Sequence, residues 1–147
     1  MKKYLPHLIL FFSFFSFSQN FDKTISDLIS SYESQVIELR HWFHENAELS
    51  NREFKTSERI ANELRKIGLD PQTGVAKTGV VALLQGGKPG PVVALRADID
   101  GLPVKERADL TWASKMTGEY NGDTVPVMHA CGHDTHTAIL LGVKSSL

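Results

Sequence analysis

The sequence predicts an α/β fold in which helices cover a sheet. Apolar residues recur at helical spacing near the start of the chain and again at its end. Between these segments lie two short apolar runs, which a Gly- and Pro-rich turn separates. The chain has 147 residues with a hydrophobic content of 41%, which is enough for one domain with a core of its own.

Two helices are predicted in the first half. From Phe21 to about Glu45, apolar residues recur in steps of three and four, as on one face of an amphipathic helix. A second helix is expected from Phe54 to Ile67, and Gly68 stands where a glycine commonly ends a helix.

The next segments predict strands and then a third helix. The runs Val80–Leu84 and Val92–Leu95 indicate a hairpin or two neighbouring strands, and the second run suggests a strand covered on both faces. Residues 104–124 are polar and irregular, with Trp112 as a packing anchor. After His133 a helix is expected, capped by Asp134 or Thr135. Its pattern continues to the last residue, so we expect a piece of a longer protein.

Residues 1–18 are expected to be a secretory signal peptide. Lys2 and Lys3 precede an apolar run from about Leu8 to Phe17, and a small residue, Ser18, stands at the expected cleavage site. The alternative is a membrane anchor, but the run is about half of the roughly 20 residues that a spanning helix needs. We therefore expect export to a periplasm or the cell exterior, and residues 19–147 form the rest of the chain.

Charge and cysteine content narrow the function classes. The 16 basic and 17 acidic residues leave no basic surface for nucleic acid. Cys131 is the only cysteine, so it cannot form a disulfide within the chain. It is a free thiol, an intermolecular bridge or a metal ligand.

One candidate site is the segment "RADIDGLP", residues 96–103. On a strand, Arg96, Asp98 and Asp100 would point to the same side. The two carboxylates would then lie at the carboxyl end of a buried strand, where active sites of open α/β sheets are found. The alternative is a loop with solvated acids, one of them paired with Arg96.

A second candidate site is the segment "HACGHDTH", residues 129–136. In an extended chain, His129, Cys131 and His133 would point the same way, and thiolate and imidazole are good ligands for zinc and similar metals. Asp134 and His136 could support such ligands. A structural zinc site would need a second ligand pair, which the chain lacks. A Cys–His nucleophile pair, with His129 or His133 as the base, is a further alternative.

The segment around His44 suggests no chemistry by itself. His44 follows Trp42 and Phe43 on a predicted helix, so we expect a structural histidine.

Three segments together resemble one family. "WFHENAELSNREFKTSERIANEL", "ALRADIDGLPVKE" and "MHACGHDTHTA" are similar to segments that occur in this order in the cysteine-bearing metal-dependent amidohydrolases. These include hippurate hydrolases, N-acyl-amino-acid amidohydrolases and indoleacetyl-amino-acid hydrolases, within the aminoacylase and carboxypeptidase metallopeptidase family. Ala47 departs from the family pattern, which usually has Pro at that position.

The resemblance implies a fold and a site. It implies a mixed-sheet, zinc-peptidase-like catalytic domain flanked by helices, here truncated and without the lid domain. Cys131 and His133 match two metal ligands, in a site that holds two divalent ions (Mn, Zn, Co or Ni). The catalytic aspartate matches Asp98 or Asp100, with Asp100 as the better match.

The implied reaction is hydrolysis of the amide bond of a small N-acyl-amino-acid or peptide-like substrate by a metal-activated water. The family's other ligands and its glutamate base lie in segments that this chain does not contain, so we expect the 147-residue chain alone to be inactive. The resemblance implies no nucleic-acid partner, no membrane contact after signal cleavage, and a possible homo-oligomer of the full-length protein. The alternatives are an inactive metal-binding remnant and a Cys–His thiol hydrolase.

Overall fold

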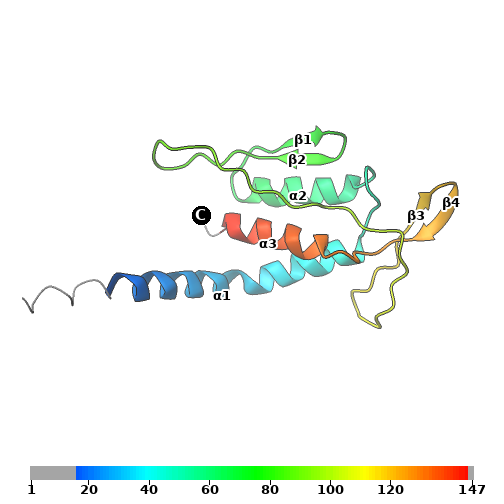
Figure 1. The fold of residues 1–147 in the computed structure, drawn as a ribbon, viewed down its shortest axis with the longest axis horizontal. Coiled ribbons are helices and arrows are strands. Elements are labelled where there is room, and N and C mark those ends of the chain that lie inside the picture. The colour runs from blue at the N-terminus through cyan, green and yellow to red at the C-terminus, as the bar shows by residue number, and fades with distance from the viewer. Residues whose placement is uncertain (1–15, 146–147) are drawn as a thin grey trace, which may run out of the picture.

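The computed structural model describes residues 16–145, with side chains from residue 23 to residue 143. Within this range the chain forms three helices and two antiparallel hairpins (Figure 1). The α/β prediction is confirmed. The elements in chain order are α1 (Ser16–Glu45), α2 (Phe54–Lys66), β1 (Gln72–Val75), β2 (Gly79–Val81), β3 (Thr117–Tyr120), β4 (Asp123–Pro126) and α3 (His133–Ser145).

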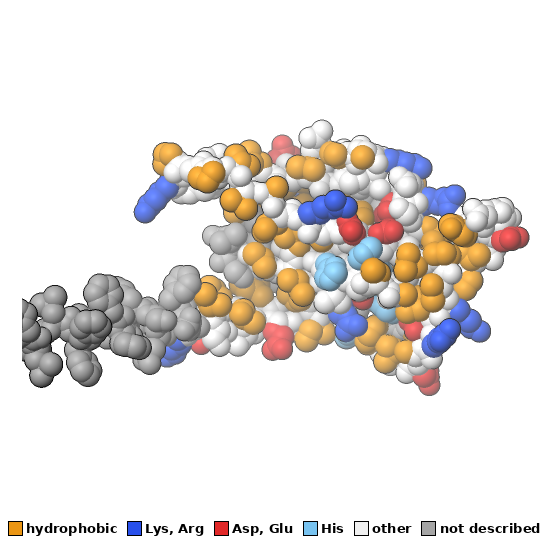
Figure 2. Space-filling model, viewed as in Figure 1, with side chains coloured by type: hydrophobic (Ala, Val, Ile, Leu, Met, Phe, Trp, Pro, Cys, Tyr) orange, Lys and Arg blue, Asp and Glu red, His pale blue; other side chains and the backbone are white. Residues whose placement is uncertain are grey.

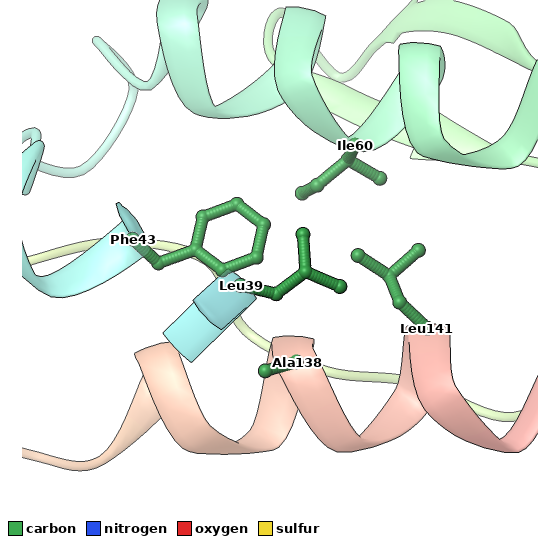
Figure 3. Packing of buried hydrophobic residues seen from close by; sticks show 5 residues of the cluster. All are labelled: Leu39, Phe43, Ile60, Ala138 and Leu141. Atoms are coloured by element: carbon green, nitrogen blue, oxygen red, sulfur yellow. The ribbon is translucent and has the colours of Figure 1, made fainter. Parts of the chain in front are cut away.

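The main core lies where the three helices meet. Phe43 of α1 is only 1% exposed, and it packs with Leu39 of the same helix, Ile60 of α2, and Ala138 and Leu141 of α3. Figure 3 shows these side chains converging between the helices. The stripe predicted in the first helix is therefore confirmed at Leu39 and Phe43, whereas Ile25 and Ile29 nearer its start are exposed. In the third helix the sequence pattern suggested Ile139, Leu140 and Val143 as the core face, and this is wrong: Ile139 and Val143 are exposed, and Ala138 and Leu141 face the core instead.

The glycine predicted at the end of α2 is also confirmed. Gly68 has a φ of +80°, a backbone conformation that L-residues with a side chain rarely adopt. Its N–H donates to the carbonyl of Arg65, and the N–H of Leu69 donates to the carbonyl of Leu64. These two bonds form a Schellman motif, which satisfies the last carbonyls of the helix.

A small second core connects the loop between α1 and α2 to the segment that carries Asp100. Ala47, Leu49 and Val127 are buried together, and Leu49 forms a parallel bridge with Gly101. A Cβ on Gly101 would lie 3.1 Å from both Ala47 Cβ and Val127 Cγ1, so this close approach favours glycine. The neighbouring Asp100 is thereby held at a defined position.

The predicted pairing of the runs Val80–Leu84 and Val92–Leu95 is wrong. Gly79–Val81 does form a strand, but it pairs with Gln72–Val75. The run Val92–Leu95 forms no strand, and Val92, Val93 and Leu95 are 86%, 77% and 65% exposed. No segment within residues 16–145 offers this run a neighbour for a hydrogen-bonded ladder, and a strand does not form without one. The mixed sheet is therefore not formed in the described part of the chain.

The region predicted as irregular contains a hairpin. Strands β3 and β4 pair in register from Thr117 opposite Pro126 to Tyr120 opposite Asp123. The two residues between them are Asn121 and Gly122, both with positive φ. Asn-Gly is a strong sequence signal for a two-residue hairpin turn.

The proposed signal peptide falls largely outside the described residues. Residues 1–15 are not described, and residues 16–18 belong to α1. Cleavage after Ser18 therefore stays a prediction. Among the helices that the structure describes, none has the length and apolar character needed to cross a membrane.

Candidate metal centre

The segment with the single cysteine turns sharply at Gly132 and leads into α3. Gly132 has a φ of +88°, and its carbonyl accepts hydrogen bonds from the N–H groups of Thr135 and His136. Helix α3 therefore begins at His133, and Asp134 lies inside its first turn, not before it. The predicted cap at Asp134 or Thr135 is wrong, since the carbonyl at Gly132 opens the helix.

The turn separates the three residues that were expected to point the same way. His129 is buried at 6% exposure, Cys131 is exposed, and His133 lies between these extremes. That expectation is wrong because the segment is not extended through Gly132. Cys131 and His133 remain neighbours at the open start of α3.

His133 is held by Asp100. Its Nδ1 lies 2.9 Å from Oδ1 of Asp100 and 3.0 Å from the backbone carbonyl oxygen of the same residue. Both oxygens accept, so Nδ1 is the nitrogen that carries hydrogen. The lone pair of Nε2 is then free of this interaction, and a histidine held by a carboxylate in this way is typical of metal sites.

Asp98 has a different environment. Its Oδ1 accepts bonds from Nη2 of Arg96 at 2.6 Å and from Nε of Arg96 at 3.0 Å, on the exposed surface. The Arg96 hydrogen bond and charge lower the pKa of the Asp98 carboxyl. The alternative in which Arg96 pairs with one acid is therefore confirmed for Asp98, and only Asp100 contacts a predicted ligand. On the face that Figure 2 shows, histidine side chains gather near acidic and basic ones.

His129 is a buried imidazole with no hydrogen-bond partner for either nitrogen among the described residues. Burial lowers the pKa of His129 to about 4; the negative charge of Asp134 opposes this shift, and the charges of His44 and His133 add to it. At neutral pH the ring is therefore uncharged. A buried polar group without a hydrogen-bond partner lowers the stability of the fold by about 1–3 kcal/mol. Local packing therefore does not explain why His129 is buried.

The structure also shows a charged network that the sequence did not reveal. His44 of α1 is buried, and its Nδ1 lies 2.9 Å from Oδ2 of Asp134, while its Nε2 lies 2.7 Å from Oε2 of Glu106. His44 was expected to be structural, and its burial agrees with that. Its partners lie 62 and 90 positions away in the sequence, so no local pattern could indicate them.

Both acids of this network are stabilised as carboxylates. Burial acts to raise the pKa of Asp134, but the hydrogen bonds from His44 and from the N–H of Thr135 outweigh it, and the pKa is lowered. The pKa of Glu106 is lowered to about 2, first by the N–H of Ala108 and then by His44.

The donors fit part of a metal site. Cys131 offers a thiolate and His133 an imidazole nitrogen, which zinc and its softer neighbours prefer. Within residues 16–145, no three His, Cys, Asp or Glu side chains are grouped so that they could hold a metal ion. The described residues thus supply two donors and their supporting carboxylate, not a complete ligand set.

Comparison with known proteins identifies the class. Residues 94–146 match the family model of peptidase family M20/M25/M40. The sequence is 48% identical over 115 residues to thermostable carboxypeptidase 2 of Saccharolobus solfataricus, covering 78% of this chain and 27% of that protein. It is 42% identical over 118 residues to the N-acyl-L-amino acid amidohydrolase of Geobacillus stearothermophilus, covering 80% of this chain and 30% of that protein.

A solved structure supports the same class. The fold is similar to that of the Bacillus subtilis YXEP protein, a dinuclear metal-binding peptidase of the M20 family, with a TM-score of 0.66 and 38% identity. The match covers 76% of this chain and 29% of that one. Over the parts that these matches cover, the chain is similar to members of peptidase family M20/M25/M40, and the predicted resemblance is confirmed. It spans less than a third of the length of these relatives, which are named as hydrolases.

Proposed function

We propose that Cys131 and His133 are two ligands of a two-metal centre, in a protein that hydrolyses the amide bond of N-acyl-amino-acid or small peptide-like substrates. The observation that carries this proposal is the hydrogen bond that Nδ1 of His133 donates to Asp100. The lone pair on Nε2 of His133 is then available to bind a metal ion. The named activities of the relatives and the dinuclear neighbour support the reaction class.

The roles of the chain's own residues follow from this arrangement. Bound divalent ions would lower the pKa of a water and polarise the substrate carbonyl. Asp100 keeps the hydrogen of His133 on Nδ1, so that the imidazole presents a lone pair in a fixed direction. Cys131 would bind as a thiolate, and its exposure leaves it accessible to an ion from solution. Zinc, manganese, cobalt and nickel all remain candidates for the metal.

Alkylation of Cys131 with iodoacetamide tests this role against that of a nucleophile. We expect added Zn²⁺ to slow alkylation of the chain and N-acetylamino acids to leave it unchanged. Cys131 is the only cysteine, so intact mass reports this residue alone. Protection by an acylated substrate without metal would favour the thiol hydrolase and contradict the proposal.

An activity assay of the 147-residue chain is a separate check. We expect no hydrolysis of N-acetylamino acids, since the described residues supply only two donors and no metal cluster of three. Hydrolysis that a chelator abolishes would contradict this expectation.

We also propose export by the N-terminal segment. Expression in a bacterium with an intact secretion system should yield a periplasmic product that begins at Gln19. A product that keeps residues 1–18 in the cytoplasm would contradict the proposal.

A further inference from the structure

We propose that His44 is a positioning residue for the metal ligand His133 and acts on it through Asp134; this inference rests on the proposed function. Asp134 directly follows His133 in the first turn of α3, and its side chain is 3% exposed. Its Oδ2 faces Nδ1 of His44 at 2.9 Å, and Nε of Arg40 lies 3.5 Å from the same oxygen. Helix α1 thus holds the turn that carries the ligand.

The hydrogen-bond geometry defines what His44 does. Each of its ring nitrogens faces a carboxylate oxygen, and a carboxylate can only accept. The ring of His44 therefore lies between two acceptors, on α3 and on the segment of Glu106. Charge-assisted hydrogen bonds of this kind are short and about twice as strong as neutral ones. His44 is suited to hold Asp134 and Glu106 at a fixed separation.

The surroundings restrict the ring of His44 further. Trp112 packs edge-on against it at 5.1 Å between centroids, and Trp112 in turn stacks on His41 at 4.3 Å. The guanidinium of Arg40 lies 4.9 Å from the Trp112 ring. The ring of His44 therefore cannot rotate without displacing these groups.

Two carboxylates then connect the start of α3 to other segments of the chain. Asp100 holds the imidazole of His133 directly, and Asp134 ties the backbone of the same turn to α1. Loss of either hydrogen bond would leave the imidazole of His133 less well oriented toward a metal ion. Removal of such supporting groups typically lowers metal affinity about 10- to 100-fold.

The test compares two substitutions of His44. Each of them keeps a donor for one of the two carboxylates, Asp134 or Glu106, and removes the donor for the other. The amide nitrogen of Asn lies as many bonds from Cα as Nδ1 does, and that of Gln as many as Nε2 does. His44→Asn therefore keeps a donor for Asp134, whereas His44→Gln keeps one for Glu106. Both remove the imidazole, so a general packing role would affect them alike.

The readout is the thiolate-to-Co²⁺ charge-transfer band of the 147-residue chain during titration with Co²⁺, alongside circular dichroism melting. We expect His44→Asn to retain an affinity close to that of the unmodified chain and His44→Gln to lose about tenfold. Equal affinities in the two variants, with the unmodified chain binding, would overturn the role of His44 alone. No band in the unmodified chain would overturn both this inference and the proposed function.

A second pair covers the case in which His44→Gln does not fold. Asp134→Asn removes the acceptor on α3, and Glu106→Gln removes the charge on the opposite side. We expect the first to lower Co²⁺ affinity about tenfold and the second to leave it nearly unchanged. An equal loss in both variants would also overturn the inference.

Discussion

Asp100 accepts a hydrogen bond from Nδ1 of His133 at 2.9 Å through its side chain, and its backbone carbonyl lies 3.0 Å from the same nitrogen. This double contact joins two segments that are 33 positions apart in the sequence. It also separates the two candidate aspartates, of which Asp100 was the better match to the family pattern, because Asp98 pairs with Arg96 instead.

The first prediction follows from this contact. Asp100→Asn should weaken Zn²⁺ binding by the chain about tenfold, because an amide in place of the carboxylate no longer fixes the hydrogen of Nδ1. Asp98→Asn is the matched control and should change Zn²⁺ affinity little, since the Asp98 carboxylate bonds only Arg96 in the described structure. Calorimetric titration measures both variants. A larger loss in the Asp98 variant would reverse the assignment.

The second prediction concerns acid stability. Burial lowers the pKa of His129 from its ordinary value of 6.5 to about 4 in the folded chain. At a pH between 6.5 and about 4, His129 binds a proton in the unfolded chain but not in the folded chain. The contribution of the uncharged His129 ring to the free energy of unfolding is therefore complete above pH 6.5 and is lost as the pH falls to about 4. The full loss amounts to roughly 3–4 kcal/mol.

His129→Leu should therefore flatten the decline of unfolding free energy between pH 6.5 and about 4.5. The lowered pKa values of Asp134 and Glu106 act mainly below this window. Urea melts at several pH values, with a chelator present, measure the slope. The exposed His136→Gln serves as control and should keep the slope of the unmodified chain; an unchanged slope in His129→Leu would contradict the prediction.

The third prediction tests the helical core with one substitution in two environments. Phe43→Ala should lower the free energy of unfolding by about 3–5 kcal/mol, because Phe43 is fully enclosed by α1, α2 and α3. Phe54→Ala should change it by less than about 0.5 kcal/mol, since Phe54 is 58% exposed. Chemical denaturation compares the two. Similar losses in both would mean that the core is elsewhere.

The fourth prediction concerns the β1–β2 turn. Ala76 and Lys77 have φ values of 48° and 93°, in the left-handed region that favours glycine. Lys77→Gly should stabilise the chain by roughly 1 kcal/mol, because a side chain in this conformation costs about 1–2 kcal/mol. Thermal melting measures the gain. Lys88→Gly, at an exposed position without a positive φ, should give no gain; equal shifts would rule out relief of backbone strain.

Local patterns predicted the helices well. The stripe through Leu39 and Phe43, and the glycine at position 68, depend on spacing and backbone conformation within a few residues. The Asn-Gly turn of β3–β4 carries an equally local signal, although no hairpin was predicted there.

The remaining features depend on distant partners. Val92–Leu95 has the composition of a strand, yet the described residues offer it no neighbouring strand. The bonds of His44 to Asp134 and Glu106 join segments that no periodicity relates. Cys131 and His133 were predicted as ligands because their residue types and spacing carry a signal. Asp100 and Asp134 were also among the candidate residues, whereas the partners of Asp134 on other segments were not predicted.

Calorimetric titration of the 147-residue chain with Zn²⁺ tests the central claim most directly. The account predicts weak binding that Cys131→Ser and His133→Asn each reduce at least about tenfold, and that His136→Asn, on the exposed next turn, leaves nearly unchanged. Binding that survives both substitutions, or no binding by the unmodified chain, would contradict the assignment of Cys131 and His133 as metal ligands.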